Sequence, residues 1–207
     1  MRVNEQGRSM IEMLGVLAIV GVLSVGGIAG YSKAMTKFKT NKVIDQVNML
    51  STNIRTLYAS QRTFNGLNNK LANQAGAVPS EMVENGSTSV IQNGFGGDVV
   101  ITTAEYLGQA HNAYVIAFGS IPKAACVTMA TTDWGGDAGS GFALMYVQGG
   151  TGATASTAAS TAADSTTSAG TSVAVPGNST YPTPMTVVNA QLSCTSTDKN
   201  AIAWKYI

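Results

Sequence analysis

The sequence is poor in the residues that most catalytic and metal sites use. It holds one His and two Cys among 207 residues, and charged residues are only 11% of the composition, against about 25% in ordinary soluble proteins. This set leaves almost nothing for a His/Cys metal cluster, and no Ser or Cys lies near His111 in a recognisable catalytic motif. The composition therefore favours a structural or interaction protein over an enzyme, without a metal or other cofactor.

The formal net charge is only +1, which on net charge excludes a strongly basic nucleic-acid binder and an acidic solvating tail. The charges are nevertheless unevenly placed. Residues 31–70 carry seven Lys and Arg against the single Asp45, whereas residues 71–207 carry eight acidic residues against three Lys. These segments are either two solvated surfaces, or surfaces of neighbouring copies that face each other in an assembly and set its register.

A membrane-length apolar run lies near the N-terminus. Residues 10–31 contain one charge, Glu12. As a helix they extend about 33 Å, enough to cross a hydrocarbon core of about 30 Å. A secretory signal peptide has a shorter apolar region of about 7–15 residues with a cleavage site behind it. The length of this run favours a retained membrane helix.

Two signals disagree about the side of the membrane on which the rest of the chain lies. Four lysines follow the apolar run within eleven residues, and Lys/Arg counting places such a flank in the cytoplasm. The even number of cysteines favours a location in an oxidising compartment instead. We expect the C-terminal part to lie outside the cytoplasm.

The residues around Glu12 resemble the N-terminus of type IV pilins. Gly7 is followed by Arg8, Glu12 stands at the fifth position after Gly7, and about twenty apolar residues follow. The resemblance implies that a prepilin peptidase cuts after Gly7 and that Arg8 becomes the new N-terminus. The α-amine of one subunit would then pair with the Glu12 carboxylate of its neighbour, because an unpaired charge in a low-dielectric bundle is heavily penalised.

The apolar run continues into an amphipathic stripe. Apolar residues recur at alternating spacings of four and three, which indicates one helical face. The stripe consists of Val43, Val47, Leu50, Ile54 and Leu57. We therefore predict a leader at residues 1–7, a membrane or filament-core helix at 8–32, an amphipathic helix at 33–62 and a globular head at 63–207.

The head is expected to be an α+β structure, with an antiparallel sheet packed on the long helix. Short strand-like runs bounded by Gly, Pro and Asn predict strands, and two Pro-initiated segments predict short helices. The predicted strands are 98–103, 112–118, 141–147, 186–188 and 201–207, and the predicted helices begin within 78–82 and 121–126. This order resembles the type IVb subclass of pilins.

Cys126 and Cys194 are the two cysteines of the chain. They could remain buried free thiols, but an even count in an exported head favours a disulfide. Between them lies the stretch 149–180, in which 27 of 32 residues are Gly, Ala, Ser or Thr. Such a stretch has little apolar surface to offset chain entropy, so we predict a flexible surface loop there.

The resemblance implies a structural subunit that waits in the inner membrane and then joins an extracellular pilus. The implied partners are other copies of the chain, a prepilin peptidase, the inner-membrane assembly machinery, membrane lipid and a host or bacterial surface; nucleic acid is not expected. A type II secretion pseudopilin and a minor tip pilin are the alternatives within the same resemblance. They share the same N-terminal pattern of cleavage site, Glu and apolar helix, and the sequence distinguishes poorly between these proteins and a major pilin.

Overall fold

The computed structural model describes residues 10–84, 86–136, 139–164 and 169–207. The chain divides into two compact units, residues 1–38 and 39–207. The first helix, α1 (Met10–Leu57), contributes residues to both. The second unit contains the predicted head, residues 63–207, together with the amphipathic half of α1.

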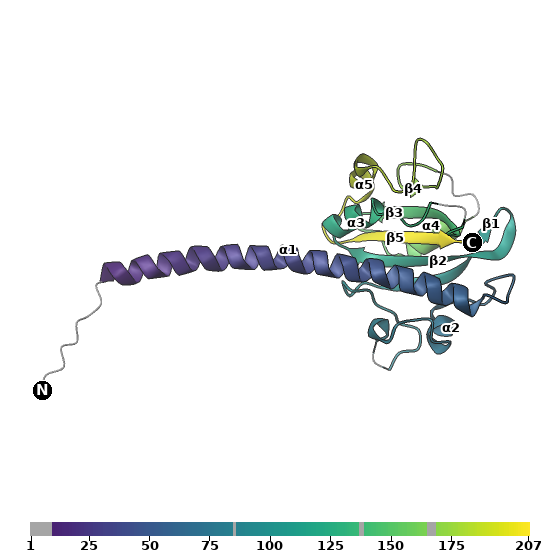
Figure 1. Cartoon of the computed structure of the whole chain (residues 1–207), viewed down its shortest axis with the longest axis horizontal. Helices are drawn as coiled ribbons and strands as arrows, with labels where there is room; N and C mark the ends of the chain where they lie inside the picture. The colour runs from purple at the N-terminus through teal and green to yellow at the C-terminus, as the bar shows by residue number, and fades with distance from the viewer. Residues whose placement is uncertain (1–9, 85, 137–138, 165–168) are drawn as a thin grey trace, which may run out of the picture. The chain divides into compact units, whose positions relative to one another are not determined.

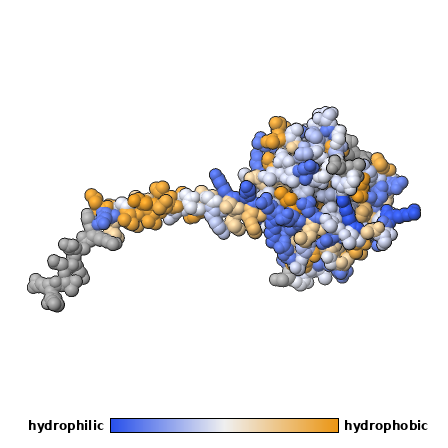
Figure 2. All heavy atoms as spheres, in the orientation of Figure 1, coloured by the Kyte–Doolittle hydropathy of each residue, from blue (hydrophilic) through white to orange (hydrophobic). Residues whose placement is uncertain are grey.

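The described part of the first unit is an uninterrupted stretch of α1 (Figure 1). It is long and apolar enough to cross a membrane, and none of the side chains in its apolar window is buried. Five glycines fall within this stretch, and a Cβ at any of them would meet nothing within 4 Å. Figure 2 shows apolar side chains over this part of the helix.

The head is built on a five-stranded antiparallel sheet of order β1-β2-β5-β3-β4. The C-terminal strand β5 lies between β2 and β3, so the chain completes the sheet by filling its centre (Figure 1). The predicted antiparallel α+β head is confirmed. The strands are β1 (Val99–Tyr106), β2 (Gln109–Ile121), β3 (Phe142–Gly149), β4 (Val173–Ala174) and β5 (Asn200–Tyr206).

One face of the sheet packs against the amphipathic half of α1. Four of the five predicted stripe residues, Val43 to Ile54, are fully buried there, and Leu57 is partly buried against the same core. Alternate residues of the strands point to this face, as the two-residue period of a strand requires. Its largest buried side chains include Tyr114, Phe118 and Trp204.

The opposite face is covered by α4 (Ala155–Ala163), which corrects the prediction that 149–180 is a flexible loop throughout. Its alanines pack on small strand residues, and a Cβ on Gly119 would lie only 2.9 Å from the Ala155 backbone nitrogen. Small side chains let the helix approach closely, and the sheet supplies the apolar surface that the segment lacks alone. The buried alanines are Ala155, Ala158, Ala159 and Ala162.

Hydrogen bonds from side chains stabilise both ends of α4. A capping box joins Thr154 and Thr157 at its N-terminus. At its C-terminus the buried Lys205 donates from Nζ to the carbonyl oxygens of Asp164 at 3.2 Å and Ala163 at 3.5 Å. A cation is favourable at this end of a helix, while burial lowers the pKa of Lys205, partly opposed by Asp164 and Glu105.

Two further boundaries differ from the sequence predictions. The amphipathic helix ends at Leu57 rather than near residue 62, because Tyr58 turns into the core and its ring lies 5.3 Å from that of Phe64. The predicted strand at 186–188 is the start of α5 (Val187–Ser193), since the Thr186 side chain accepts a hydrogen bond from the Asn189 backbone as an N-cap. The remaining helices are α2 (Asn69–Gln74), η1 (Ser80–Met82) and α3 (Lys123–Ala130).

Candidate assembly site

Glu12 lies in the first turn of α1, where a carboxylate is favoured by the helix dipole. Its neighbours Ile11 and Met13 are exposed apolar residues, at 80% and 49%. The first basic residue that follows Glu12 in the chain is Lys33, about six turns further along the helix. Within the described residues, no ion pair is made by Glu12. Gly7 and Arg8, the predicted cleavage site, lie outside the described residues.

The apolar surface around Glu12 is continuous in the first unit. Large apolar side chains from Met10 to Ile28 are all about half exposed or more. They occupy every side of the helix, a pattern typical of a helix buried in lipid or in a bundle rather than at the surface of a globular protein. This part of α1 therefore carries one carboxylate, and no described residue covers the apolar surface around it.

A buried polar contact fastens the amphipathic half of α1 to the sheet. The Tyr114 hydroxyl on β2 donates to the Ser51 carbonyl oxygen at 3.2 Å and lies 3.3 Å from the Ser51 hydroxyl. One turn further, the Arg55 guanidinium lies 5.1 Å from the centre of the Tyr206 ring, in cation–π geometry. Burial raises the pKa of Tyr114, while its contacts with Ser51 and Arg55 act in the opposite direction.

Ser51 and Arg55 are not among the residues to which the sequence assigns a role. Their four-residue spacing places them on one side of the helix, and Ser51 lies between the stripe residues Leu50 and Ile54. A polar residue inside the apolar stripe was the available signal, but its partner on β2 could not be predicted from the sequence.

A second polar contact holds the segment between α1 and β1. Glu81 accepts a hydrogen bond from the Gln46 side chain at 3.1 Å and pairs with Lys42 at 3.1 Å, the one ion pair found among the described residues. Gln46 also accepts from the Gly94 backbone at 3.0 Å. The hydrogen bonds from Gln46 and Lys42 lower the pKa of Glu81.

The disulfide joins two short helices of the head. Cys126 in α3 and Cys194 at the C-terminal end of α5 are bonded, with 6.0 Å between their Cα atoms. Both cysteines are fully buried beside the core that faces α1. The bond closes a 68-residue separation that contains β3, α4, β4 and α5.

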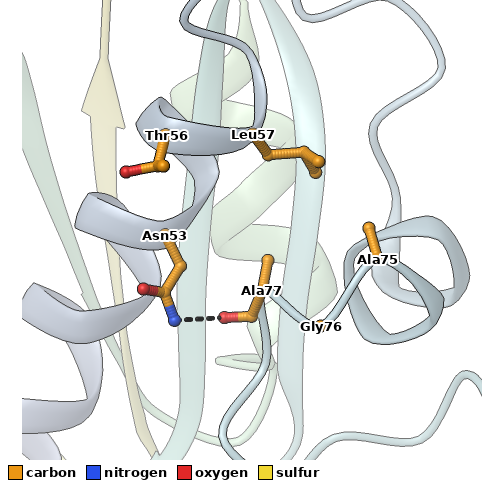
Figure 3. A pocket seen from close by; sticks show the side chains of 6 residues that line it. All are labelled: Asn53, Thr56, Leu57, Ala75, Gly76 and Ala77. Atoms are coloured by element: carbon orange, nitrogen blue, oxygen red, sulfur yellow. Dashed lines mark hydrogen bonds between the residues drawn. The ribbon is translucent and has the colours of Figure 1, made fainter.

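A groove of about 260 Å³ lies between the end of α1 and the segment after α2 (Figure 3). Its lining has no acid, base or thiol, and the Asn53 amide donates to the Ala77 carbonyl at 2.9 Å. Within the described residues, no group of three or more His, Cys, Asp or Glu side chains could hold a metal ion. The groove therefore has no chemistry of its own beyond shape. Its lining is Asn53, Thr56, Leu57, Ala75, Gly76 and Ala77.

The fold is that of a type IV pilin. The chain resembles TcpA, a type IV pilin from the Vibrio cholerae El Tor biotype, with a TM-score of 0.56 and 20% identity, over 82% of this chain and 99% of that one. It also resembles a type IVb pilin from Salmonella typhi, with a TM-score of 0.51 and 18% identity, over 80% and 98% of the two chains.

The chain belongs to the bundlin family, whose profile matches residues 32–178. Two curated relatives are each described as the major structural subunit of bundle-forming pilus, from Escherichia coli O127:H6 (strain E2348/69 / EPEC) and Escherichia coli O111:H-. Each is 29% identical over 135 residues, or 63% of this chain. The match spans 66% of the length of these relatives. The resemblance to type IV pilins predicted from the sequence is confirmed.

Proposed function

We propose that this protein is the major structural subunit of a type IV pilus, made as a membrane-anchored precursor and polymerised into an extracellular filament. The two curated relatives are major structural subunits of a pilus, which favours this role over a secretion pseudopilin or a minor tip pilin. The subunit has a structural role and catalyses no reaction.

One observation carries the proposal: the apolar part of α1 is unburied while the head completes two cores without it. The described residues before Met35 are all exposed, whereas the head buries apolar residues on both faces of its sheet. Burying apolar surface contributes roughly 25 cal/mol per Å². Lipid can cover the helix of the precursor, and the helices of other copies can cover it in a filament.

Glu12 gives the filament its register in this proposal. Cleavage after Gly7 frees the α-amine of Arg8, and this ammonium pairs with the Glu12 carboxylate of a neighbouring copy. Removing one partner of a buried pair costs roughly 3–5 kcal/mol, because the other charge is left uncompensated. Registers that separate the two charges are therefore strongly disfavoured.

The test is Glu12→Ala in cells that carry the assembly machinery. The expected result is that the subunit stays in the membrane fraction and no filaments are sheared from the surface. Glu84→Ala is the matched control, because it removes an exposed head carboxylate and should leave filaments unchanged. Normal filaments from the Glu12 variant would refute the role of this residue.

N-terminal sequencing of sheared filaments tests the processing step. A chain that begins at Arg8 supports cleavage after Gly7 by a prepilin peptidase, and an intact leader contradicts it. Counting subunits per filament by mass spectrometry tests the major role, since a minor pilin would be present in only a few copies. The inner-membrane machinery and a host or bacterial surface remain the further partners of this proposal.

A further inference from the structure

Two lysines that follow the apolar part of α1 form no ion pair with any residue that the structure describes. Lys33 and Lys37 are exposed, and neither forms an ion pair with a described residue. The sequence has no acidic residue between Glu12 and Asp45, so neither lysine has an acid within one helical turn. Lys42, by contrast, pairs with Glu81 in the head.

Two exposed aromatic side chains flank these lysines along the helix. Tyr31 is 67% exposed and Phe38 is 63% exposed, although large aromatic residues are usually buried in a soluble protein. Tyr and Trp are favoured where a helix passes from hydrocarbon to water, as are lysines whose stems lie on apolar surface. We refer to Tyr31, Lys33, Lys37 and Phe38 as the collar.

The positions of the collar residues fit a headgroup layer. At 1.5 Å per residue, Lys33 lies about 3 Å beyond Tyr31 along the axis, and Lys37 lies about 9 Å beyond it. The interfacial layer on each side of a bilayer is about 5–8 Å thick, and a lysine side chain can bend back toward it. Both ammonium groups can therefore reach lipid phosphates while residues 10–31 span the hydrocarbon.

The distribution of the collar around the helix favours lipid over a protein partner. At about 100° per residue, the two lysines lie about 40° apart, and the two aromatic residues lie about 20° apart. The centres of the two pairs are separated by about 130° around the axis. A single neighbouring protein would contact one side of the helix, whereas a bilayer surrounds all sides.

We propose that the collar binds anionic phospholipid headgroups and holds the precursor at a fixed depth in the membrane. The inference rests on the proposed membrane-anchored precursor and adds the class of lipid that it contacts. Two observations carry it: unpaired cationic lysines complement anionic headgroups, and the collar is continuous with the membrane-length apolar surface.

The test uses the full-length chain in phosphatidylcholine vesicles with trace spin-labelled lipid. Electron paramagnetic resonance then compares how strongly labelled phosphatidylglycerol and labelled phosphatidylcholine associate with the protein. We expect about a threefold preference for phosphatidylglycerol at low salt, which falls toward onefold in about 0.5 M NaCl. The Lys33→Gln/Lys37→Gln variant should lose the preference at low salt.

The matched control is Lys123→Gln/Lys199→Gln, which removes the same charge from two exposed lysines of the head. It should keep the preference. Equal association of both lipids with the unmodified chain, or an unchanged preference in the Lys33/Lys37 variant, would overturn the inference. If that variant keeps its lipid preference but fails to form filaments, the lysines contact a neighbouring subunit instead.

Insertion is measured separately by resistance to an alkaline wash. A chain that stays in the vesicles without lipid preference refutes the collar alone. A chain that is washed out refutes the membrane-anchored precursor, and the collar with it.

Discussion

The Tyr114 hydroxyl and Ser51 meet in the buried layer between α1 and the sheet, with the hydroxyl 3.2 Å from the Ser51 carbonyl oxygen. The carbonyl belongs to the helix backbone, so the contact ties β2 directly to α1. Residues 63 apart in the sequence are joined in this way. Removing the Tyr114 hydroxyl oxygen therefore tests how much this contact stabilises the packing of α1 on the sheet.

Tyr114→Phe removes this oxygen and keeps the ring. We expect the free energy of unfolding to fall by about 1 kcal/mol, because a typical buried hydrogen bond contributes this much. Urea unfolding of the full chain in detergent, followed by Trp134 and Trp204 fluorescence, measures it. Tyr31→Phe is the control, since its ring is exposed and its loss of a hydroxyl should leave the midpoint unchanged.

Head stability should fall as the pH rises above about 10. Burial raises the pKa values of Tyr114 and Tyr206, while tyrosines of the unfolded chain lose their protons near pH 10. The folded state then holds more protons than the unfolded state, so its stability is full below pH 10 and declines as the pH rises. Lys205 acts the other way, because burial lowers its pKa.

Unfolding curves at pH 8, 10 and 11 on the Tyr114→Phe variant separate these contributions. The variant should show a smaller alkaline loss than the unmodified chain, since one buried hydroxyl no longer titrates. An equal loss in both proteins would show that Tyr114 does not contribute to the alkaline transition.

The disulfide should stabilise the head by about 4 kcal/mol, the chain-entropy value for a closed loop of this size. Replacing both cysteines, as Cys126→Ala with Cys194→Ala, should lower the free energy of unfolding by that amount. The same variant measured with and without reductant is the control, because it has no bond left to reduce. Free-thiol labelling of both cysteines in shed filaments would contradict an exported, bonded head.

The packing of α4 on the sheet can be tested with a matched pair of substitutions. Ala159→Leu places a large side chain in the interface with the sheet, whereas Ser160→Leu places it on the exposed side of the same helix. We expect a loss of about 1–3 kcal/mol from overpacking in the first and little change in the second. Equal effects in urea unfolding would indicate that residues 155–163 do not pack on the sheet.

The long helix could be predicted because its evidence is local. A run of apolar residues followed by a stripe at Val43, Val47, Leu50 and Ile54 is readable from spacing alone, and these four side chains are buried as expected. The strands around Ile101, Ile116 and Ile202 are likewise predicted by short strand-like runs bounded by Gly, Pro and Asn. Glu12 and Gly7 stand at readable positions in the chain, and their roles stay predictions.

Composition was a poorer guide to the Ala/Ser/Thr-rich stretch. Its lack of large apolar residues predicted a flexible loop, yet residues 155–163 form a helix. The same small side chains that cannot form a core alone can pack closely on a sheet whose facing residues are small as well. Likewise, residues 186–188 are predicted to form a strand. In the structure, Thr186 is instead the N-cap of α5, and Val187 and Val188 lie in its first turn.

The sequence by itself determined the membrane-length helix, its single carboxylate and its amphipathic continuation, because these depend on hydropathy and spacing along one chain. Only the tertiary structure decided that α4 covers the back of the sheet, that Tyr114 reaches Ser51 and that β5 fills the centre. Those features depend on surfaces contributed by distant segments, and no local pattern records which segments will meet.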